Sequence, residues 1–211
     1  MTSTSFILYS LVASGIVSIF LIISCATSNW MEYNGTIQDL VEIPVNVNSG
    51  PFIISIYFDT SYDSTTAHMN SGDCTIANVQ NYAILTLSQE DCGKWTGTKA
   101  CIVIATILSS LFFVYTLYIL YSMFYTSQTR EAQPSGFKLH VSSGVCCFVF
   151  LFSLVSAVLF SRIKIFSGGL YEANPGWSFL LVILSSVITF VQLLGHCYLS
   201  RVLIQQYEVI S

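Results

Sequence analysis

Long apolar stretches alternate with polar segments along this chain, and the apolar stretches contain no Asp, Glu, Lys or Arg. Four such stretches occur, at about residues 6–28, 100–125, 139–161 and 177–200. A helix needs about 20 mostly apolar residues to cross the hydrocarbon core of a bilayer, and each stretch reaches that length. The pattern therefore predicts four transmembrane helices, with connecting segments at residues 29–99, 126–138 and 162–176 and a tail at residues 201–211.

The first apolar stretch has an alternative interpretation as a cleaved secretory signal. Ser24-Cys25-Ala26 fits the small-residue pattern of a cleavage site. However, the apolar run exceeds the usual length of about 7–15 residues, and no basic residue precedes it. The sequence therefore favours a retained first helix, whereas cleavage would leave three helices.

The first connecting segment is long enough to fold by itself, and its pattern is that of β-strands. Residues 37–43 and 44–47 alternate in part between apolar and polar side chains, and residues 52–58 are rich in β-branched and aromatic ones. Asn48-Ser49-Gly50-Pro51 is typical of a turn. These signals predict a hairpin, and hence a small antiparallel sheet built from this segment.

Two further parts of the same segment have a readable pattern. Residues 59–73 are polar and typical of turns, whereas residues 82–87 offer another short strand.

The basic residues barely decide which side of the membrane the termini occupy. Four spans place both termini on one side, and positively charged residues usually accumulate on the cytoplasmic side. If the termini are cytoplasmic, three basic residues lie inside and four lie outside, and this count slightly opposes a cytoplasmic location. The inner residues are Arg130, Lys138 and Arg201, and the outer residues are Lys94, Lys99, Arg162 and Lys164.

Cysteine and tryptophan positions favour cytoplasmic termini. Cys74 and Cys92 are the cysteines that lie clear of the apolar stretches, and both fall in the first connecting segment. They are natural disulfide partners in an oxidising compartment. Trp30, Trp95 and Trp177 fall at membrane boundaries on the same side, where tryptophan anchors at the interface. We therefore expect this segment to be extracellular.

Asn34 supports the same orientation, because Asn34-Gly35-Thr36 is a glycosylation sequon.

Composition excludes several functional classes. Only 9% of the 211 residues are charged and the net charge is −4, whereas soluble domains carry about 25% charged residues. No nucleophile with an adjacent base, no phosphate-binding glycine loop and no basic nucleic-acid patch is readable. We expect no enzyme, no cofactor and no nucleic-acid partner.

Polar residues within the apolar stretches follow helical spacing. Small residues recur every fourth position in the first stretch, at Ser10, Ser14 and Ser18, which suits close helix packing within the bundle or between copies. A second stripe, in the fourth stretch, consists of Ser185, Thr189, Gln192 and His196. Hydrogen bonds between helices are the favoured interpretation, and an ion path is the alternative.

Several cysteines and histidines gather in the cytoplasmic halves of the third and fourth stretches, namely His140, Cys146, Cys147, His196 and Cys197. Their spacing matches no closed zinc motif. Burial or palmitoylation of these cysteines is the favoured interpretation, and no metal site is expected. Cys25 and Cys101 are expected to be apolar core thiols.

Several of these features together resemble the claudin superfamily, which includes relatives of peripheral myelin protein and calcium channel gamma subunits. Trp30 matches the tryptophan after the family's first helix, Cys74 and Cys92 match its loop disulfide, and Gly176-Trp177-Ser178-Phe179 resembles the entry to its fourth helix. The resemblance spans essentially the whole chain. It departs from the family where Gly72-Asp73 precedes Cys74 in place of Gly-Leu-Trp.

The resemblance implies a left-handed four-helix transmembrane bundle with a small extracellular antiparallel sheet. It also implies a plasma-membrane protein of cell–cell junctions, acting in adhesion or in a paracellular barrier and associating with copies of itself on the same or the neighbouring cell. The alternative, implied by the gamma subunits, is an auxiliary subunit that modulates or traffics an ion channel or receptor. Membrane lipids are the remaining expected partners.

Acidic residues dominate the predicted extracellular segment, among them Asp39, Glu42, Asp59, Asp63 and Asp73. If copies of the chain line a paracellular path, this charge favours cations over anions. The alternative is that these are ordinary solvated carboxylates.

Tyr207 and Ile210 fit the tyrosine-x-x-apolar pattern that endocytic adaptors read. The alternative is an unstructured tail.

Overall fold

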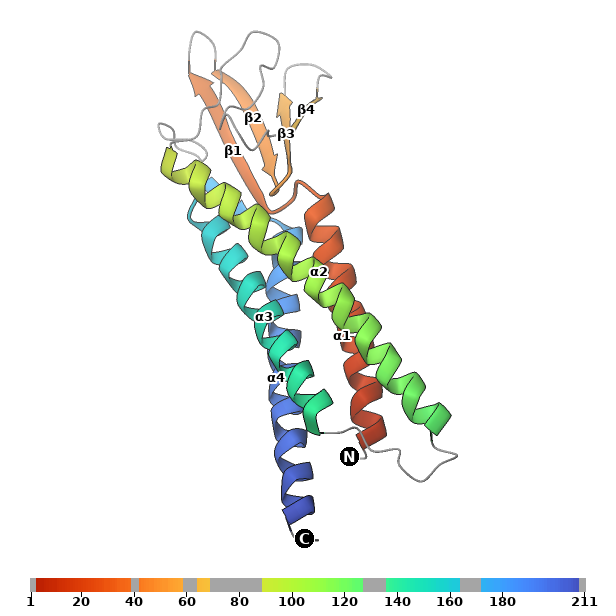
Figure 1. Ribbon diagram of the computed structural model, residues 1–211. Helices are drawn as coiled ribbons and strands as arrows, with labels where there is room; N and C mark the ends of the chain where they lie inside the picture. The colour runs from red at the N-terminus through yellow and green to blue at the C-terminus, as the bar shows by residue number, and fades with distance from the viewer. Residues whose placement is uncertain are drawn as a thin grey trace. The chain divides into compact units, whose positions relative to one another are not determined.

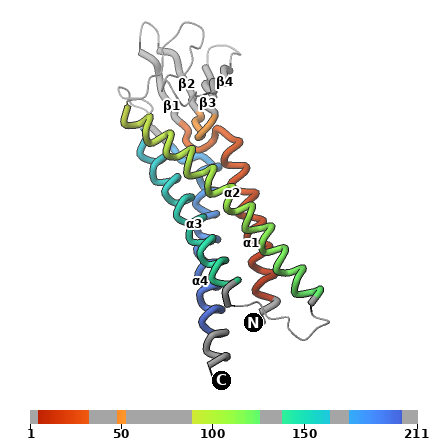
Figure 2. The backbone as a smooth tube through the Cα atoms, in the orientation of Figure 1, coloured from red at the N-terminus to blue at the C-terminus, as the bar shows by residue number. Residues whose placement is uncertain are grey.

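The computed structural model describes residues 3–38, 42–58, 64–68, 89–126, 136–163 and 172–208. Four helices lie within these ranges, α1 (Ser3–Ala26), α2 (Gln89–Thr126), α3 (Gly136–Ser161) and α4 (Trp177–Glu208) (Figures 1 and 2). Each helix is long and apolar enough to cross a membrane. The predicted set of four spanning helices is confirmed, and it indicates a multi-pass membrane protein.

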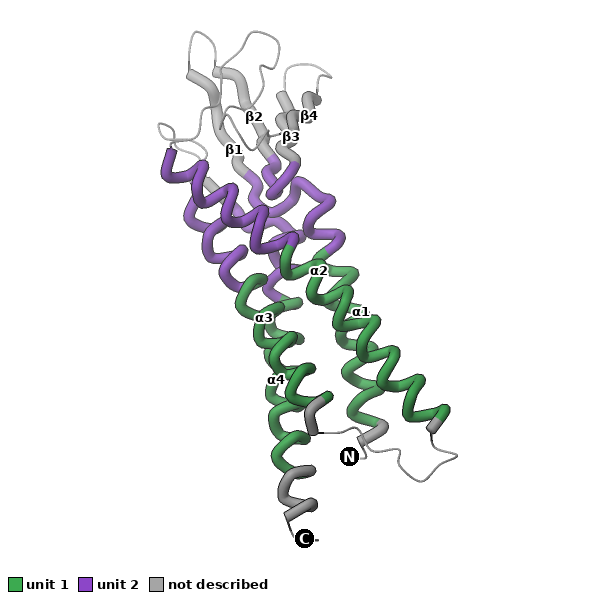
Figure 3. Tube along the Cα trace, viewed as in Figure 1, with its two compact units in different colours: residues 1–21, 104–153, 184–211 green, residues 22–103, 154–183 purple. Residues whose placement is uncertain are grey.

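The chain divides into two compact units, which Figure 3 shows in different colours. Unit 1 comprises Met1–Leu21, Ile104–Ser153 and Leu184–Ser211, and unit 2 comprises Ile22–Val103 and Leu154–Ile183. Each unit contains a segment of every helix. The β-strands belong to unit 2, and both ends of the chain belong to unit 1.

The helices expose large apolar side chains and bury small and polar ones. Leu111 is 62% exposed and Leu194 is 54% exposed, whereas Ser14 and Ser142 are buried. Soluble proteins rarely expose apolar surface on this scale. In lipid, small and polar residues favour contacts between helices, so the observed distribution is the one that a membrane-spanning chain requires.

An antiparallel sheet of five strands forms in unit 2, in the order β4-β3-β2-β1-β5. Its strands are β1 (Met31–Gln38), β2 (Glu42–Ser49), β3 (Ile53–Phe58), β4 (Ser64–His68) and β5 (Glu172–Pro175). The predicted hairpin is confirmed, because β2 pairs with β3 across the expected turn, with Ser49 opposite Ile54.

Three expectations about the sheet were wrong. The segment expected to be turn-like contains β4, because Thr65 and Thr66 are β-branched residues that suit a strand. The sheet also draws on the third connecting segment as well as the first, since β5 pairs with β1 and places Met31 opposite Pro175. Residues 37–43, expected to lie in one strand, span the end of β1 and the start of β2. The strand expected at residues 82–87 lies outside the described residues.

Helix α2 begins at Gln89, well before the predicted span at residue 100. Glu90 and Asp91 lie in its first turn, where negative charge favours a helix N-terminus. Lys94 bonds both carboxylates, with Nζ 2.7 Å from Glu90 Oε1 and 3.1 Å from Asp91 Oδ1. Residues 89–99, which the sequence analysis assigned to the first connecting segment, are therefore helical.

Helix α4 likewise continues to Glu208, so most of the predicted tail is helical as far as its backbone is described.

Two buried glycines in unit 2 allow the chain to make close backbone contacts. A Cβ on Gly176 would overlap the carbonyl oxygen of Asn29, and a Cβ on Gly50 would overlap that of Thr27. In contrast, a Cβ on Gly93 would meet nothing within 4 Å. Only glycine fits at the first two positions without backbone movement.

We predict that Gly176→Ala lowers the free energy of unfolding by about 1–3 kcal/mol, the usual cost of overpacking. Gly93→Ala is the matched control, and it should raise stability by about 0.5–1 kcal/mol because alanine is the better helix former. Thermal unfolding of the purified protein in detergent measures both effects. Equal melting temperatures for the two variants would contradict the close contact at Gly176.

Candidate functional site

Trp30 is the centre of the region where the sheet joins the helices, which we call the sheet–helix junction. It directly precedes β1, and its side chain is fully buried. Its indole Nε1 donates to the carbonyl oxygen of Ser24 at 2.7 Å. Its ring meets Phe160 of α3 and Phe179 of α4 edge-on, with centroid distances of 4.9 Å and 6.1 Å. Trp30 thus links the end of α1 to two other helices.

Backbone and hydroxyl bonds join the start of α4 to the end of α1. The amide nitrogens of Gly176 and Ser178 donate to the carbonyl oxygens of Trp30 and Asn29, at 2.9 Å and 3.1 Å. The hydroxyl groups of Ser178 and Thr27 lie 2.6 Å apart. These bonds fix β5 and the first turn of α4 against the entry to β1.

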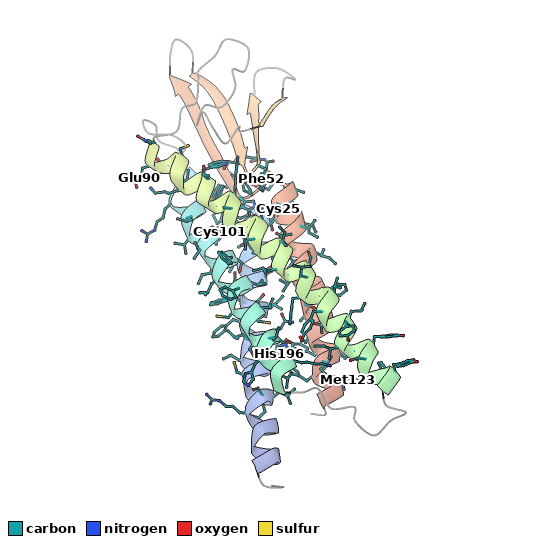
Figure 4. All side chains as sticks on the ribbon, viewed as in Figure 1. Cys25, Phe52, Glu90, Cys101, Met123 and His196 are labelled. Carbon is teal, nitrogen blue, oxygen red and sulfur yellow. The ribbon has the colours of Figure 1, made fainter. Side chains whose placement is uncertain are left out.

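Trp95 joins α2 to the β2–β3 turn. Its Nε1 donates to the carbonyl oxygen of Pro51 at 2.9 Å, and its ring lies 5.5 Å from that of Phe160. One turn further along, Lys99 Nζ lies 5.6 Å from the ring centre of Phe52, which Figure 4 labels. A cation at this distance from an aromatic face is attracted to the ring.

The expectation that all three tryptophans are membrane-interface anchors needs correction. Trp30 and Trp95 are buried, and backbone carbonyls satisfy both of their N–H groups. They serve as core residues of unit 2, because protein atoms supply both the apolar surroundings and the acceptor that an interface would otherwise provide. Trp177 is 47% exposed and remains the candidate for an anchor.

Cys92 lies in the first turns of α2 and is disulfide-bonded. Cys74 lies outside the described residues, so its pairing with Cys92 stays a prediction. Among the described residues, the cysteines outside a disulfide are Cys25, Cys101, Cys146, Cys147 and Cys197. Cys146 is buried, as one interpretation expected, and Cys197 is exposed.

A second group of polar side chains lies in unit 1, which we call the polar cluster: Ser10 of α1 with Gln192 and His196 of α4. Gln192 Nε2 donates to the carbonyl oxygen of Ser10 at 2.9 Å. Ser10 Oγ and His196 Nε2 are hydrogen-bonded at 3.0 Å. All three residues are buried, and Figure 4 labels His196. The predicted interhelical hydrogen bonding is therefore confirmed for Gln192 and His196.

Aromatic rings surround the imidazole of the polar cluster. Phe6 and Phe112 meet His196 edge-on, with centroid distances of 5.0 Å and 5.9 Å. Within the part of the chain that the structure describes, Nδ1 of His196 is buried without a hydrogen-bond partner. A Cβ on Gly195 would collide with the Phe6 ring, so the absence of a side chain there lets the ring reach His196.

The serine stripe of α1 packs within unit 1. Ser18 Oγ lies 2.8 Å from Ser109 Oγ of α2, and Ser14 Oγ donates to the carbonyl oxygen of Leu11. A similar pair joins α3 to α4, where Ser153 and Ser186 hydroxyl oxygens lie 2.8 Å apart. Packing within the bundle, the favoured interpretation of the stripe, is thus observed.

For several predicted site residues, the structure describes the backbone alone or does not describe the residue. Asn34 lies in β1, paired with Asn46 of β2 and Glu172 of β5, and only its backbone is described. Tyr207 lies in the last turn of α4, again by backbone alone. Glu42 begins β2. The remaining predicted residues, Asp39, Asp59, Asp63, Asp73 and Ile210, lie outside the described residues.

The side chains of the sheet–helix junction and of the polar cluster join secondary-structure elements. Among the described residues, no group of three or more His, Cys, Asp or Glu could hold a metal ion. Both regions consist of hydroxyl, amide, imidazole and indole groups that hold elements together. No family model matches the chain, and no curated protein matches it either.

Sequence reasoning missed the roles of Phe160 at the sheet–helix junction and of Ser10 in the polar cluster. Phe160 contacts both buried tryptophans, yet it is one of many phenylalanines in apolar stretches and carried no distinguishing signal. Ser10 was read as a small packing residue rather than as the partner of Gln192 and His196. Its spacing from Ser14 and Ser18 indicated a buried face, but nothing in the sequence indicated which helix it meets.

We predict that Trp30→Ala lowers the free energy of unfolding by about 3–5 kcal/mol, the usual cost of removing a buried tryptophan. Trp177→Ala is the matched control; because this side chain is half-exposed, the change should stay within about 0.5 kcal/mol. Thermal unfolding in detergent reports both values. Equal destabilisation by the two substitutions would show that Trp30 is not the central packing residue.

We predict a coupling free energy of about 0.6 kcal/mol, and at most about 1.7 kcal/mol, between Ser10 and His196, as measured for hydrogen bonds between membrane helices. A double-mutant cycle of Ser10→Ala and His196→Ala measures it. Ser14→Ala replaces Ser10→Ala in the control cycle, since Ser14 bonds to its own helix. Coupling of the same size in both cycles would contradict a specific Ser10–His196 bond.

Proposed function

We propose that this chain is a claudin-like four-span protein of the plasma membrane that acts at cell–cell junctions, in adhesion or in a paracellular barrier. One observation carries the proposal. Two of the motifs that carry the resemblance to claudins, Trp30 and Gly176–Phe179, lie far apart in the sequence but meet at the sheet–helix junction. Gly176 donates to the carbonyl oxygen of Trp30, and Phe179 packs against its ring. The two motifs therefore form one contact between the end of α1 and the start of α4.

This contact attaches the sheet to the helices. β1 follows Trp30, β5 precedes Gly176, and the β2–β3 turn is held by Trp95. Interfaces between proteins lose less entropy when the binding surface is ordered before contact. A sheet fastened at three places suits a protein that presents one surface to partners on the same or the neighbouring cell.

The proposed orientation places the sheet outside the cell and both termini in the cytoplasm. Cys92 is disulfide-bonded, and disulfides persist in oxidising, extracellular environments. The strands and Cys92 belong to unit 2, whereas both termini belong to unit 1. We propose Cys74 as its partner, because it is the other cysteine of the same segment.

We also propose that the paracellular path formed by this chain is selective for cations. Acidic residues outnumber basic ones in unit 2; the acids are Glu32, Asp39, Glu42, Asp59, Asp63, Asp73, Glu90, Asp91 and Glu172, and the bases are Lys94, Lys99, Arg162 and Lys164. Such a surface concentrates cations within a Debye length of about 8 Å at physiological ionic strength. Copies of the chain facing each other across a narrow gap would therefore favour sodium over chloride.

We predict that expressing the tagged protein in a tight epithelial monolayer raises the permeability of sodium relative to chloride, measured as a dilution potential. Replacing Asp39, Glu42, Asp59, Asp63 and Asp73 by the corresponding amides should remove the bias. Glu90→Gln is the matched control, since Lys94 already neutralises this carboxylate, and it should leave the bias nearly unchanged.

Imaging of the same cells tests the proposed location, because a junction protein should concentrate at cell contacts. Anion preference, or a bias that survives the five replacements, would contradict a paracellular cation path. Co-purification with a channel or receptor and no enrichment at contacts would favour the auxiliary-subunit function instead.

A further inference from the structure

Two basic side chains, Lys138 and Arg201, lie in the described part of unit 1. Among the side chains that the structure describes in this unit, the formal charges are those of Lys138 and Arg201, and no carboxylate is present. In unit 2, Lys94 pairs with two carboxylates and Lys99 lies over an aromatic ring, while Arg162 is exposed. Among the described side chains of unit 1, these two cations have no carboxylate to pair with.

A hydrogen bond joins α3 and α4 close in sequence to both cations. Ser200 Oγ of α4 lies 3.3 Å from His140 Nε2 of α3. Arg201 follows Ser200 directly, and Lys138 lies in the first turns of α3 together with His140. When the Ser200 hydroxyl donates to Nε2, the imidazole carries its proton on Nδ1 and adds a further donor to the group.

Exposed side chains along α4 show what surrounds this group. A stripe of apolar residues at helical spacing leads toward it, namely Leu184, Val187, Val191 and Leu194, each about half exposed. Tyr198, 71% exposed, continues the stripe, and exposed Arg201 follows on the same face. Apolar residues, then tyrosine, then arginine is the order expected from the hydrocarbon core through the interface to the lipid head groups.

Helix α2 has the same order in unit 1. Its exposed Leu111, Val114 and Leu117 are followed by exposed Tyr118, Tyr121 and Tyr125. The rings of Tyr121 and Tyr125 stack with centroids 6.1 Å apart. Tyrosine is enriched where membrane meets water, so a second helix independently indicates an interface at this end of unit 1.

We propose that Arg201, together with Lys138 and His140, binds the head group of an anionic phospholipid. A guanidinium group matches phosphate oxygens with two parallel hydrogen bonds. Basic groups between transmembrane helices bind anionic head groups in this way. A lipid is the partner that fits, because the stripe below Arg201 offers its acyl chains an apolar surface that a soluble phosphate would not use.

The test uses the purified full-length protein in neutral detergent, with native mass spectrometry to count retained lipids. The probes are dioctanoyl phosphatidylserine, dioctanoyl phosphatidylcholine and inorganic phosphate. We expect phosphatidylserine to be retained in preference to phosphatidylcholine, and inorganic phosphate not to displace it at equal concentration. Arg201→Gln should weaken the retention of phosphatidylserine about fivefold, the effect of one basic residue near an anionic membrane surface.

Arg162→Gln is the matched control, because Arg162 is an exposed cation of unit 2, and it should leave the retention unchanged. Arg201→Lys keeps the charge and should preserve the preference, and Lys138→Gln provides a second loss of charge if Arg201→Gln fails to fold. Equal retention of the two lipids, equal losses in Arg162→Gln and Arg201→Gln, or displacement by inorganic phosphate would overturn the proposal.

Discussion

Hydrogen bonding in the absence of water is the constraint on which this structure depends. Within hydrocarbon, each polar group must find a partner in the protein, and the helices supply one for most of the chain. Several side chains follow the same rule, whereas Nδ1 of His196 is buried without a partner among the described residues. Thr116 bonds to the carbonyl oxygen of Phe112 one turn earlier, and Ser18 bonds to Ser109 on another helix. Polar residues therefore lie inside each unit, while large apolar residues face outward.

The same constraint explains the sheet–helix junction. Here the chain leaves regular helix, so N–H and carbonyl groups lose their partners within the helix. Trp30, Gly176 and Ser178 satisfy them across segments that are distant in sequence. Because these contacts need close backbone approach, glycine is required at Gly176. The result is a sheet attached to the helices by the residues that also carry the resemblance to claudins.

Charge is divided between the two units, and the two proposals rest on this division. Unit 2 carries the strands and an excess of acidic residues, which suits a surface that meets cations and partner proteins in water. Unit 1 carries Lys138 and Arg201 beside exposed tyrosines, which suits anionic lipid. Both proposals concern where the chain sits and what it contacts.

The sequence by itself determined the four helices and the β2–β3 hairpin, because apolar length and the turn at Asn48–Pro51 are local properties. It did not determine that Trp30 is buried, since a tryptophan at a membrane boundary has the same sequence context whether lipid or Phe160 covers it. Nor did it determine that Ser10 meets His196, or that β5 joins the sheet. These contacts link residues far apart in the chain, and only the tertiary structure decides which buried polar groups satisfy one another.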